Sequence, residues 1–288
     1  MTAVVSQLPA FTVVDALPPD RIPVVFDSPH SGLYYPPDFR PALAMEDLRK
    51  AEDMYVDAFY AEAASHGAAL LLAHFPRIYI DANRTLADMD QDLLDAPWPE
   101  PLEPSIKTEC GLGLIWRLAS NGDPIYDRRL SVAECQARIA TFYAPYHDAL
   151  KRLLDDRHAG FGTVYHVNCH SMPELSGPNA PEGPGVPRAD FVLGNRDGST
   201  ASPAFTNLVA GCLRGQGYSV AINDPYKGVE LVRAYSDPAT KRHSLQIEIN
   251  RRLYMNETTF AKSADFAATK AAIERLVGVI ADFARSQA

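Results

Sequence analysis

Two histidines stand where a metal-binding side chain would be well placed. His30 lies in SPHSG and His170 in NCHSM, and each follows an apolar, strand-like run. Zinc sites that activate water for hydrolysis commonly combine two histidines with one carboxylate and an open position. The alternative is a pair of loop histidines that make structural hydrogen bonds. This alternative stays open because the sequence has neither an HExxH motif nor a short H-x-x-E pair, which would indicate a metal site more specifically. The spacing alone does not decide between these two interpretations.

A carboxylate ligand would have to come from the acidic segment AEDMYVD. This segment offers Glu52, Asp53 and Asp57, and the last two are four residues apart, on one face of a predicted helix. The usual role of such residues is to form a solvated acidic helix face. All three carboxylates therefore stay open as ligands at this point.

A further carboxylate, Glu248, lies between Ile247 and Ile249 in an apolar, strand-like segment. One interpretation is that it faces solvent on the pleat. The other is that it points into a site, where burial raises the pKa of a carboxyl towards that of a useful general base.

Several cations follow strand-like or glycine-bearing segments. Asn83 and Arg84 end the segment DANR, and a guanidinium binds a carboxylate through a two-point fork, although a surface salt bridge is the commoner role. Arg117 in GLGLIWR and Lys227 or Arg233 in YKGVELVR offer positive charge for an oxyanion or a substrate carboxylate. None of these segments is a P-loop, a GxGxxG turn or a GxSxG elbow, so each is unspecific by itself.

The elements that would position these residues alternate between strands and helices. Apolar, β-branched runs predict strands in Ile22–Gly32, Gly162–Met172 and the start of Ser244–Met255, and one or two strands in Ala68–Arg84. Helical spacing predicts helices over Met45–His66 and Ser131–Asp156. This alternation indicates an α/β fold with a mainly parallel sheet, in which ligands bind beyond the carboxyl ends of the strands.

Three local signals refine these helices. Gly67 is expected to cap the first, Ser131 and Glu134 resemble a capping box at the start of the second, and Pro145 is expected to kink the second.

Composition bounds the class of protein. The chain has 288 residues and a net charge of −9, which argues against a nucleic-acid binder. The four cysteines are widely spaced, the first 20 residues lack a signal-peptide pattern, and no apolar run approaches the roughly 18 residues of a membrane span. We therefore expect one catalytic domain over residues 1–288 in the cytoplasm. A chain of this size needs no metal to fold, so any metal would be catalytic.

Taken together, these motifs resemble those of the N-formylglutamate amidohydrolase family. The series SPHSG, D-x-x-x-D, D-x-NR, PIYDR, PYH, CHS, YKG and Q-x-E runs in family order from about residue 20 to 257. The resemblance implies a zinc-dependent hydrolase similar to carboxypeptidases and aspartoacylases. It also implies a three-layer α/β fold, with a mainly parallel or mixed central sheet flanked by helices.

The resemblance also implies roles for the residues above. His30, Asp53 and His170 would bind one zinc ion, with Asp53 preferred to Glu52 because it matches the acidic position usual in the family. Glu248 would be the general base, and Arg117 would meet the developing oxyanion. Asn83 and Arg84 would hold the α-carboxylate of the amino acid, and Lys227 or Arg233 would meet its side-chain carboxylate.

The implied reaction is hydrolysis of an N-acyl amino acid such as N-formyl-L-glutamate, which gives formate and glutamate. The wider group carries H-x-x-E, whereas this chain has Leu33 in place of the acidic residue, and it has NCHS where family members dedicated to histidine breakdown usually have a DAHS-like segment. A carboxypeptidase-like peptidase, an N-acyl amino acid deacylase of other specificity and a non-catalytic binding protein remain as alternatives. The sequence does not fix the oligomeric state.

Overall fold

The central feature of the fold is a seven-stranded sheet. A computed structural model describes residues 8–177 and 183–288. The strand order is β1-β3-β2-β4-β7-β5-β6. The strands are β1 (Phe11–Val14), β2 (Val24–Ser28), β3 (Ala69–Ala73), β4 (Val164–Met172), β5 (Phe191–Gly194), β6 (Val220–Ile222) and β7 (Arg242–Asn250).

The four central strands β3, β2, β4 and β7 run parallel to one another. The edge strand β1 is antiparallel to β3, and β5 is antiparallel to β7 on the other side. The sheet is therefore mixed and mostly parallel, which confirms the predicted α/β class. Its topology brings the carboxyl ends of the four central strands to one edge, where the polar motifs of the sequence follow.

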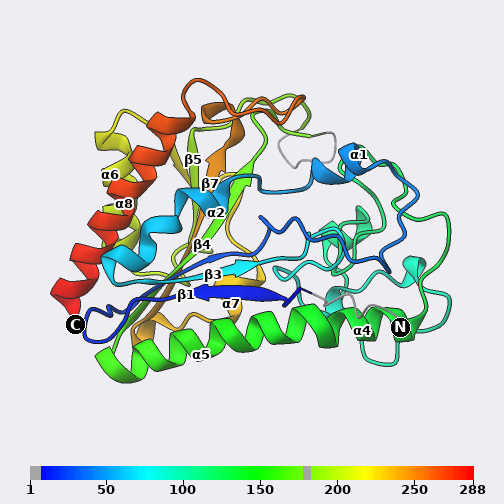
Figure 1. The fold of residues 1–288 in the computed structure, drawn as a ribbon, viewed down its shortest axis with the longest axis horizontal. Coiled ribbons are helices and arrows are strands. Elements are labelled where there is room, and N and C mark those ends of the chain that lie inside the picture. Colours follow the sequence, from blue (N-terminus) through cyan, green and yellow to red (C-terminus); the bar gives the residue numbers. More distant parts are fainter. Residues whose placement is uncertain (1–7, 178–182) are drawn as a thin grey trace, which may run out of the picture.

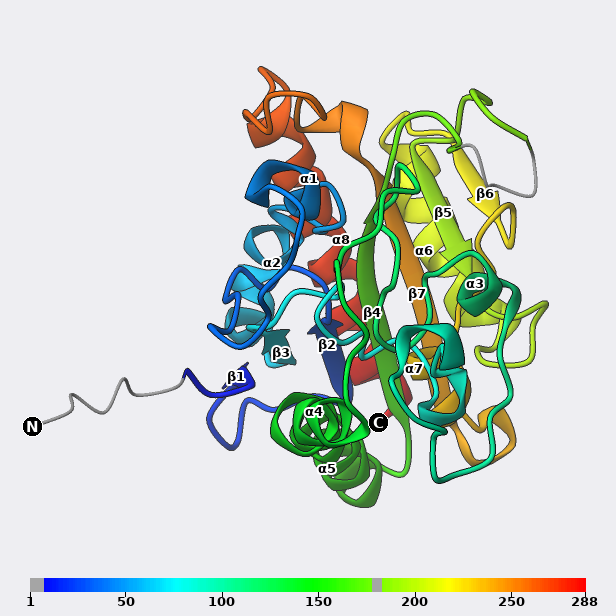
Figure 2. The ribbon, with the colours of Figure 1, turned by 90° about the vertical axis from the view of Figure 1, so that its right-hand side faces the viewer.

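Helices cover both faces of this sheet (Figures 1 and 2). One face packs against α2 (Val56–Phe59), α6 (Pro203–Gly215) and α8 (Phe266–Gln287) in a core that includes Val167 and Ile247. The other face packs against α5 (Ala144–Phe161) and the long segment between β3 and α4 (Val132–Arg138). The remaining α-helices are α1 (Met45–Arg49), α3 (Ile106–Glu109) and α7 (Glu230–Ala234). Among the described residues, no helix is long and apolar enough to cross a membrane.

The predicted helix over Met45–His66 is wrong as one continuous element. It is divided into α1, α2 and a 3-10 helix, Ala61–His66, that ends as expected at the left-handed Gly67. The break lies at Asp53, whose backbone N–H donates to the carbonyl of His30 at 3.0 Å instead of continuing a helix. Tertiary pairing therefore overrides helical periodicity and brings Asp53 beside the segment that follows β2.

The segment Ala68–Arg84 contains one strand, β3, and then a turn. The backbone N–H of Tyr79 donates to the carbonyl of Pro76, so the second predicted strand does not form. The predicted long helix after Ser131 is present as α4, a π-helical turn at Ile139–Tyr143, and α5. Ser131 caps it through the N–H of Glu134, and the π turn lies directly before Pro145, where the regular hydrogen-bond ladder cannot continue.

The central strands carry polar side chains on one face. The register places Asn168 beside Gln246 and His170 beside Glu248, while Cys169 and Ile247 point to the apolar core on the opposite face. This alternation builds a buried polar layer that leads to the carboxyl edge of the sheet.

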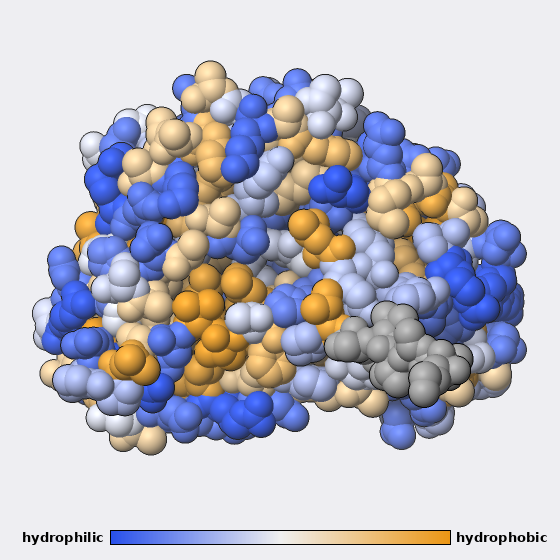
Figure 3. Space-filling view, in the orientation of Figure 1, coloured by the Kyte–Doolittle hydropathy of each residue, from blue (hydrophilic) through white to orange (hydrophobic). Residues whose placement is uncertain are grey.

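At the far edge, β1 was not foreseen in the sequence. Its Val13 and Val14 are partly exposed, and Figure 3 shows apolar side chains gathered over this strand.

Candidate metal centre and active site

His30, Asp53 and His170 converge at the carboxyl edge of the sheet. His30 follows β2 by two residues, His170 lies near the end of β4, and Asp53 lies in the break between α1 and α2. All three are buried, and the two Nδ1 atoms and the Asp53 Oδ2 atom face one another. The Nδ1 atoms are 3.1 Å apart, and Oδ2 lies 3.0 Å from Nδ1 of His170 and 3.4 Å from Nδ1 of His30.

These three distances fit the coordination of a small divalent cation. A tetrahedral zinc site with bonds of about 2.0–2.1 Å places its ligand atoms about 3.3 Å apart. The three edges of the triangle lie within a few tenths of an ångström of that length. The residues present can therefore hold a metal ion, and three protein ligands leave a coordination position for water or substrate.

The outer nitrogen of His30 is held by a buried ion pair. Its Nε2 lies 2.7 Å from Oδ1 of Asp81, and the other oxygen of Asp81 accepts from Arg77 at 2.9 Å and from Trp116 at 3.3 Å. Burial by itself would raise the pKa of Asp81, but the charges of Arg77 and His30 hold it well below its usual value. The ionised carboxylate accepts a hydrogen bond from Nε2–H of His30, so the proton stays on Nε2 and Nδ1 presents a lone pair to the metal site.

Asp53 is held by a second cation from behind. Its Oδ1 accepts from Arg251 at 3.2 Å and from Ser171 at 3.2 Å, which leaves Oδ2 facing the histidines. Burial would raise the pKa of Asp53, but its interactions with His170 and His30 hold it well below the usual value.

Glu52, the alternative ligand, instead accepts from Tyr35 and pairs with Arg49. Asp57, on α2, is also outside the His30–Asp53–His170 group.

His170 makes its strongest outer contact with Asn168, whose Oδ1 lies 2.6 Å from Nε2. Asn83 approaches the same nitrogen through Nδ2 at 3.4 Å, and its Oδ1 accepts from the backbone N–H of Leu231. An amide nitrogen can only donate, so a protonated Nε2 bonds to Asn168 and not to Asn83. The Asn83 amide nitrogen thus lies beside the outer nitrogen of His170. Burial lowers the pKa of His170, which favours the neutral ring that a metal needs.

Glu248 lies beside His170 in the register of β4 and β7, and it is buried. Burial and then the negative charge of Asp53 raise the pKa of Glu248 well above its usual value. Its Oε1 accepts from Gln246 at 2.9 Å. The carboxyl group is therefore placed next to the metal ligands in the desolvated environment that a general base requires.

The π turn and α5 hold the segment that carries Asn83 and Arg84. Tyr143 donates to the carbonyl of Arg84 at 2.8 Å, and His147 Nε2 lies 2.8 Å from the carbonyl of Ala82. Arg84 is buried, and its Nε donates a hydrogen bond to the carbonyl of Leu112 while its Nη1 donates to the carbonyl of Asn83. These contacts fix the backbone on both sides of Asn83.

Arg84 also lies 3.8 Å from Asp88, and a carboxylate partner is present for the predicted oxyanion partner Arg117 and for the two candidates for the side-chain carboxylate. Arg117 pairs with Asp90 at 2.7 Å, Lys227 with Asp197 at 2.9 Å, and Arg233 with Glu230 at 2.7 Å. The last two are more than half exposed. Substrate would have to share or displace these partners, and the roles of the three residues stay predictions.

Sequence reasoning missed the residues that hold the ligands. These are Asp27, Arg77, Asp81, Trp116, Asn168 and Arg251. One signal was available: Asn168 and His170 are two residues apart on a strand, so their side chains share a face. The pairing of Arg77 with Asp81 depends on a turn that the sequence pattern did not predict.

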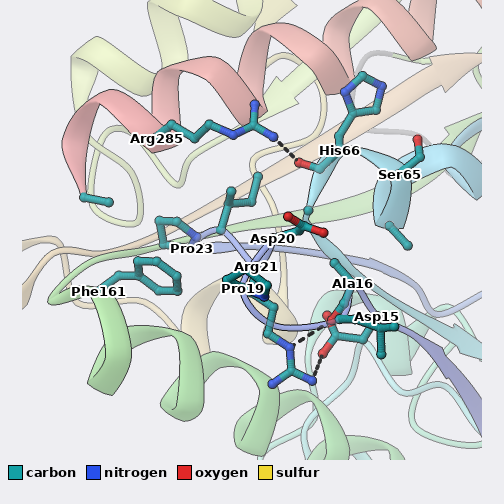
Figure 4. A pocket seen from close by; sticks show the side chains of 15 residues that line it. Asp15, Ala16, Pro19, Asp20, Arg21, Pro23, Ser65, His66, Phe161 and Arg285 are labelled. Carbon is teal, nitrogen blue, oxygen red and sulfur yellow. Dashed lines mark hydrogen bonds and ion pairs between the residues drawn. The ribbon is translucent and has the colours of Figure 1, made fainter.

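A separate pocket of about 720 Å³ lies at the other end of the sheet, beside the start of β2 (Figure 4). Its lining includes Asp15, Arg21, His66 and Arg285, and none of the three metal-site residues. Arg285 there donates to the backbone carbonyl of His66, and Arg21 pairs with Asp15. This pocket carries no part of the chemistry described above.

An α/β fold in which a buried His–Asp–His group that could hold a metal lies beside a buried glutamate is the arrangement expected of a metal-dependent hydrolase. Comparison with known proteins gives the family. The family model "N-formylglutamate amidohydrolase" matches residues 22–255. The chain is 45% identical to the N-formylglutamate amidohydrolase of Ralstonia eutropha JMP134, whose crystal structure it matches with a TM-score of 0.90 over 98% of this chain and 100% of that one.

Two curated relatives, both called N-formylglutamate deformylase, agree with this. The protein from Pseudomonas aeruginosa is 30% identical over 89% of this chain and 92% of its own length, and that from Pseudomonas putida is 29% identical over 83% and 84%. A product of Agrobacterium tumefaciens shares the fold at 20% identity, with a TM-score of 0.69 over 96% of each chain. The chain belongs to the N-formylglutamate amidohydrolase family, and it is an amidohydrolase.

Proposed function

We propose that this enzyme hydrolyses N-formyl-L-glutamate to formate and glutamate with a zinc ion held by His30, Asp53 and His170. The observation that carries the proposal is the triangle of ligand atoms with edges of 3.0–3.4 Å. Without a cation, two imidazole lone pairs and a carboxylate oxygen would face one another in a buried space. A bound divalent ion supplies Lewis acidity, polarising the amide carbonyl and lowering the pKa of water.

Glu248 is proposed as the general base and then the general acid. It takes a proton from the water that attacks the formyl carbon, and it delivers a proton to the nitrogen as the C–N bond breaks. The products are formate and the free amino group of glutamate. Its position beside His170 and its raised pKa support this assignment.

Asn83 and Arg84 are proposed to hold the α-carboxylate of the substrate. Support comes from the position of the Asn83 amide nitrogen beside His170 and from the backbone contacts of Tyr143 and His147 on either side. Arg117 remains the candidate partner for the oxyanion, after release from Asp90.

A cluster of cations supports the proposal that the enzyme recognises a second carboxylate on its substrate. Burial, followed by the positive charges of Arg84, Arg77 and Arg188, lowers the pKa of Lys107. The positive charges of Arg77 and Arg188 also act to lower the pKa of Glu248. The side chain of Lys107 makes no ion pair or hydrogen bond within the described residues. Arg77 pairs with Asp81 and Arg84 lies 3.8 Å from Asp88, whereas Lys107 is left for a charge that the substrate brings. A second carboxylate, as in N-formylglutamate, would supply that charge. Lys107 is thus a competitor to Lys227 and Arg233 for the side-chain carboxylate.

The test is hydrolysis of a matched panel of substrates, followed by release of the free amino acid, which every member of the panel yields. N-formyl-L-glutamate, N-formyl-L-glutamine, N-acetyl-L-glutamate and short dipeptides are compared by kcat/KM with zinc-loaded enzyme. The proposal predicts the highest kcat/KM for N-formyl-L-glutamate, because both the charged side chain and the small acyl group are recognised. Preference for dipeptides would establish the peptidase alternative, and preference for N-acetyl-L-glutamate a deacylase of different specificity.

A further inference from the structure

A line of hydrogen bonds leads from His170 back into the centre of the sheet. Nε2 of His170 lies 2.6 Å from Oδ1 of Asn168, and Nδ2 of Asn168 donates to Oδ1 of Asp27 at 2.8 Å. Asn168 and His170 are two residues apart on β4, and Asp27 on β2 is the register partner of Asn168. All three side chains are buried, so water does not compete for these contacts.

Asp27 is fully engaged as a hydrogen-bond acceptor. Its Oδ1 also accepts from Nε2 of His166 at 2.9 Å, and its Oδ2 accepts from Tyr146 on α5 at 2.7 Å. Burial alone would raise the pKa of Asp27, but the interactions with His166 and the hydrogen bonds of Asn168 and Tyr146 lower it. The group is therefore an ionised carboxylate that can only accept hydrogen bonds.

A fixed acceptor at position 27 decides which way the amide of Asn168 turns. The NH₂ group must face Asp27, so the amide oxygen faces His170. An oxygen there needs a proton on Nε2 of His170, which leaves the lone pair on Nδ1, the atom that faces His30 and Asp53. If the amide turned over, its NH₂ group would favour a proton on Nδ1 and block the ligand atom.

We propose that Asp27 and Asn168 are positioning residues that hold His170 in the Nε2–H tautomer and so prepare Nδ1 for the metal. This proposal rests on the proposed metal-dependent function. The outer nitrogens of the two histidines thus have different supports, because Nε2 of His30 contacts the carboxylate of Asp81 directly, whereas Nε2 of His170 reaches the carboxylate of Asp27 only through the amide of Asn168. The intervening amide keeps a further negative charge away from Asp53 and Glu248, which already share this buried region.

The first test replaces the acceptor at position 168. Asn168→Leu is similar in size and removes the oxygen, so the dissociation constant for zinc, measured by competition with a chelator, should rise about 10–100-fold. Asn168→Asp is used only together with Asp27→Leu, because in the single variant two buried carboxyl groups would lie about 2.8 Å apart. The control is Asn195→Leu, a buried asparagine bonded to Thr206 and Asn223 away from the site, which should leave the zinc affinity unchanged.

The second test asks whether Asp27 acts through Asn168. Asp27→Leu removes the acceptor that orients the amide, so its zinc affinity should fall with that of Asn168→Leu. In the double variant Asp27→Leu/Asn168→Asp, a carboxylate at position 168 needs no orientation, and the zinc affinity should recover most of the loss. A double variant as weak as Asp27→Leu would overturn the proposed order of action.

A measurement on the wild type keeps the proposal testable if these variants do not fold. In zinc-loaded protein labelled with ¹⁵N-histidine, His170 should show its proton on Nε2 and its metal on Nδ1. The opposite assignment would overturn the proposal, as would a zinc affinity of folded Asn168→Leu equal to that of the wild type. Failure of the proposed function has a different signature, namely wild-type protein that binds no divalent metal.

Discussion

Glu248 and His170 lie side by side in the register of two parallel strands, β7 and β4, at the carboxyl edge of the sheet. This relationship places a desolvated carboxyl group next to the metal-binding triangle. We predict that Glu248→Gln keeps the fold and the bound metal but lowers kcat about 10²–10⁴-fold, the usual contribution of a positioned acid–base group. Steady-state kinetics and metal analysis of the same sample check this.

The matched control for this prediction is Glu134→Gln, on α4 and paired with Arg128 and Arg138 away from the site. It should retain kcat. A Glu248→Gln variant with wild-type kcat would show that Glu248 is a spectator.

The cation that recognises the substrate side chain can be identified by comparing two lysines. Lys107→Met should raise KM for N-formyl-L-glutamate about tenfold or more, and should affect N-formyl-L-glutamine much less, because the amide side chain has no charge to lose. Lys227→Met removes a lysine that is exposed and already paired with Asp197, so we expect a smaller change. The reverse order of the two variants would assign the role to Lys227 instead.

Gly32 in SPHSG is required by close packing. A Cβ atom at this position would lie 2.4 Å from the carbonyl carbon of His74 and from the carbonyl oxygen of Phe75, and 2.5 Å from the carbonyl oxygen of His74; these backbone atoms cannot move as a flexible side chain would. We predict that Gly32→Ala lowers the free energy of unfolding by about 1–3 kcal/mol or more, the cost typical of overpacking. Gly211→Ala, in α6 where a Cβ meets nothing within 4 Å, should instead increase stability by about 0.5–1 kcal/mol. Urea denaturation of the two variants measures both effects, and a neutral Gly32→Ala would remove this explanation of the motif.

His147 should make the stability of the protein depend on pH. Burial lowers the pKa of His147 below its usual value of 6.5, so the unfolded chain binds a proton at a higher pH than the folded one does. The stabilising contribution of the neutral ring is therefore complete above about pH 6.5, and it is lost as the pH falls towards the folded pKa. His147→Gln should reduce the decline in unfolding free energy between pH 7 and pH 5.

The control for this pH effect is His66→Gln, whose ring hydrogen-bonds to none of the described residues. This variant removes a histidine without removing a ring hydrogen bond, so an equal change of slope in both variants would show that the effect is not specific to His147. An unaltered slope in His147→Gln would contradict the argument.

The fold class was accessible from the sequence because its signals are local. Apolar strand runs such as Gly162–Met172 and the cap at Ser131 depend only on neighbouring residues, and both are present in β4 and α4. The break at Asp53 was not accessible, because it depends on a backbone hydrogen bond to His30, 23 positions earlier in the chain. No periodicity reports such a contact.

The site residues divide in the same way, into those indicated by local sequence and those that depend on contacts between distant segments. His30 and His170 could be proposed from their positions after strand-like runs, and Asp53 only with the help of a family resemblance. Asp81 and Arg251 were missed because their roles depend on contacts between elements. The turn after β3 brings Asp81 to His30, and the end of β7 brings Arg251 to Asp53. Sequence patterns predict which elements form, whereas the contacts that orient a ligand are made between elements.

The most direct test of this account compares two adjacent carboxylates. Asp53→Asn and Glu52→Gln are prepared side by side, and zinc content and formate release are measured before and after treatment with a chelator and re-addition of zinc. The account predicts that wild type and Glu52→Gln bind about one zinc per chain and regain activity with zinc, whereas Asp53→Asn loses both. Full activity of metal-free wild type, or loss of zinc only in Glu52→Gln, would contradict it.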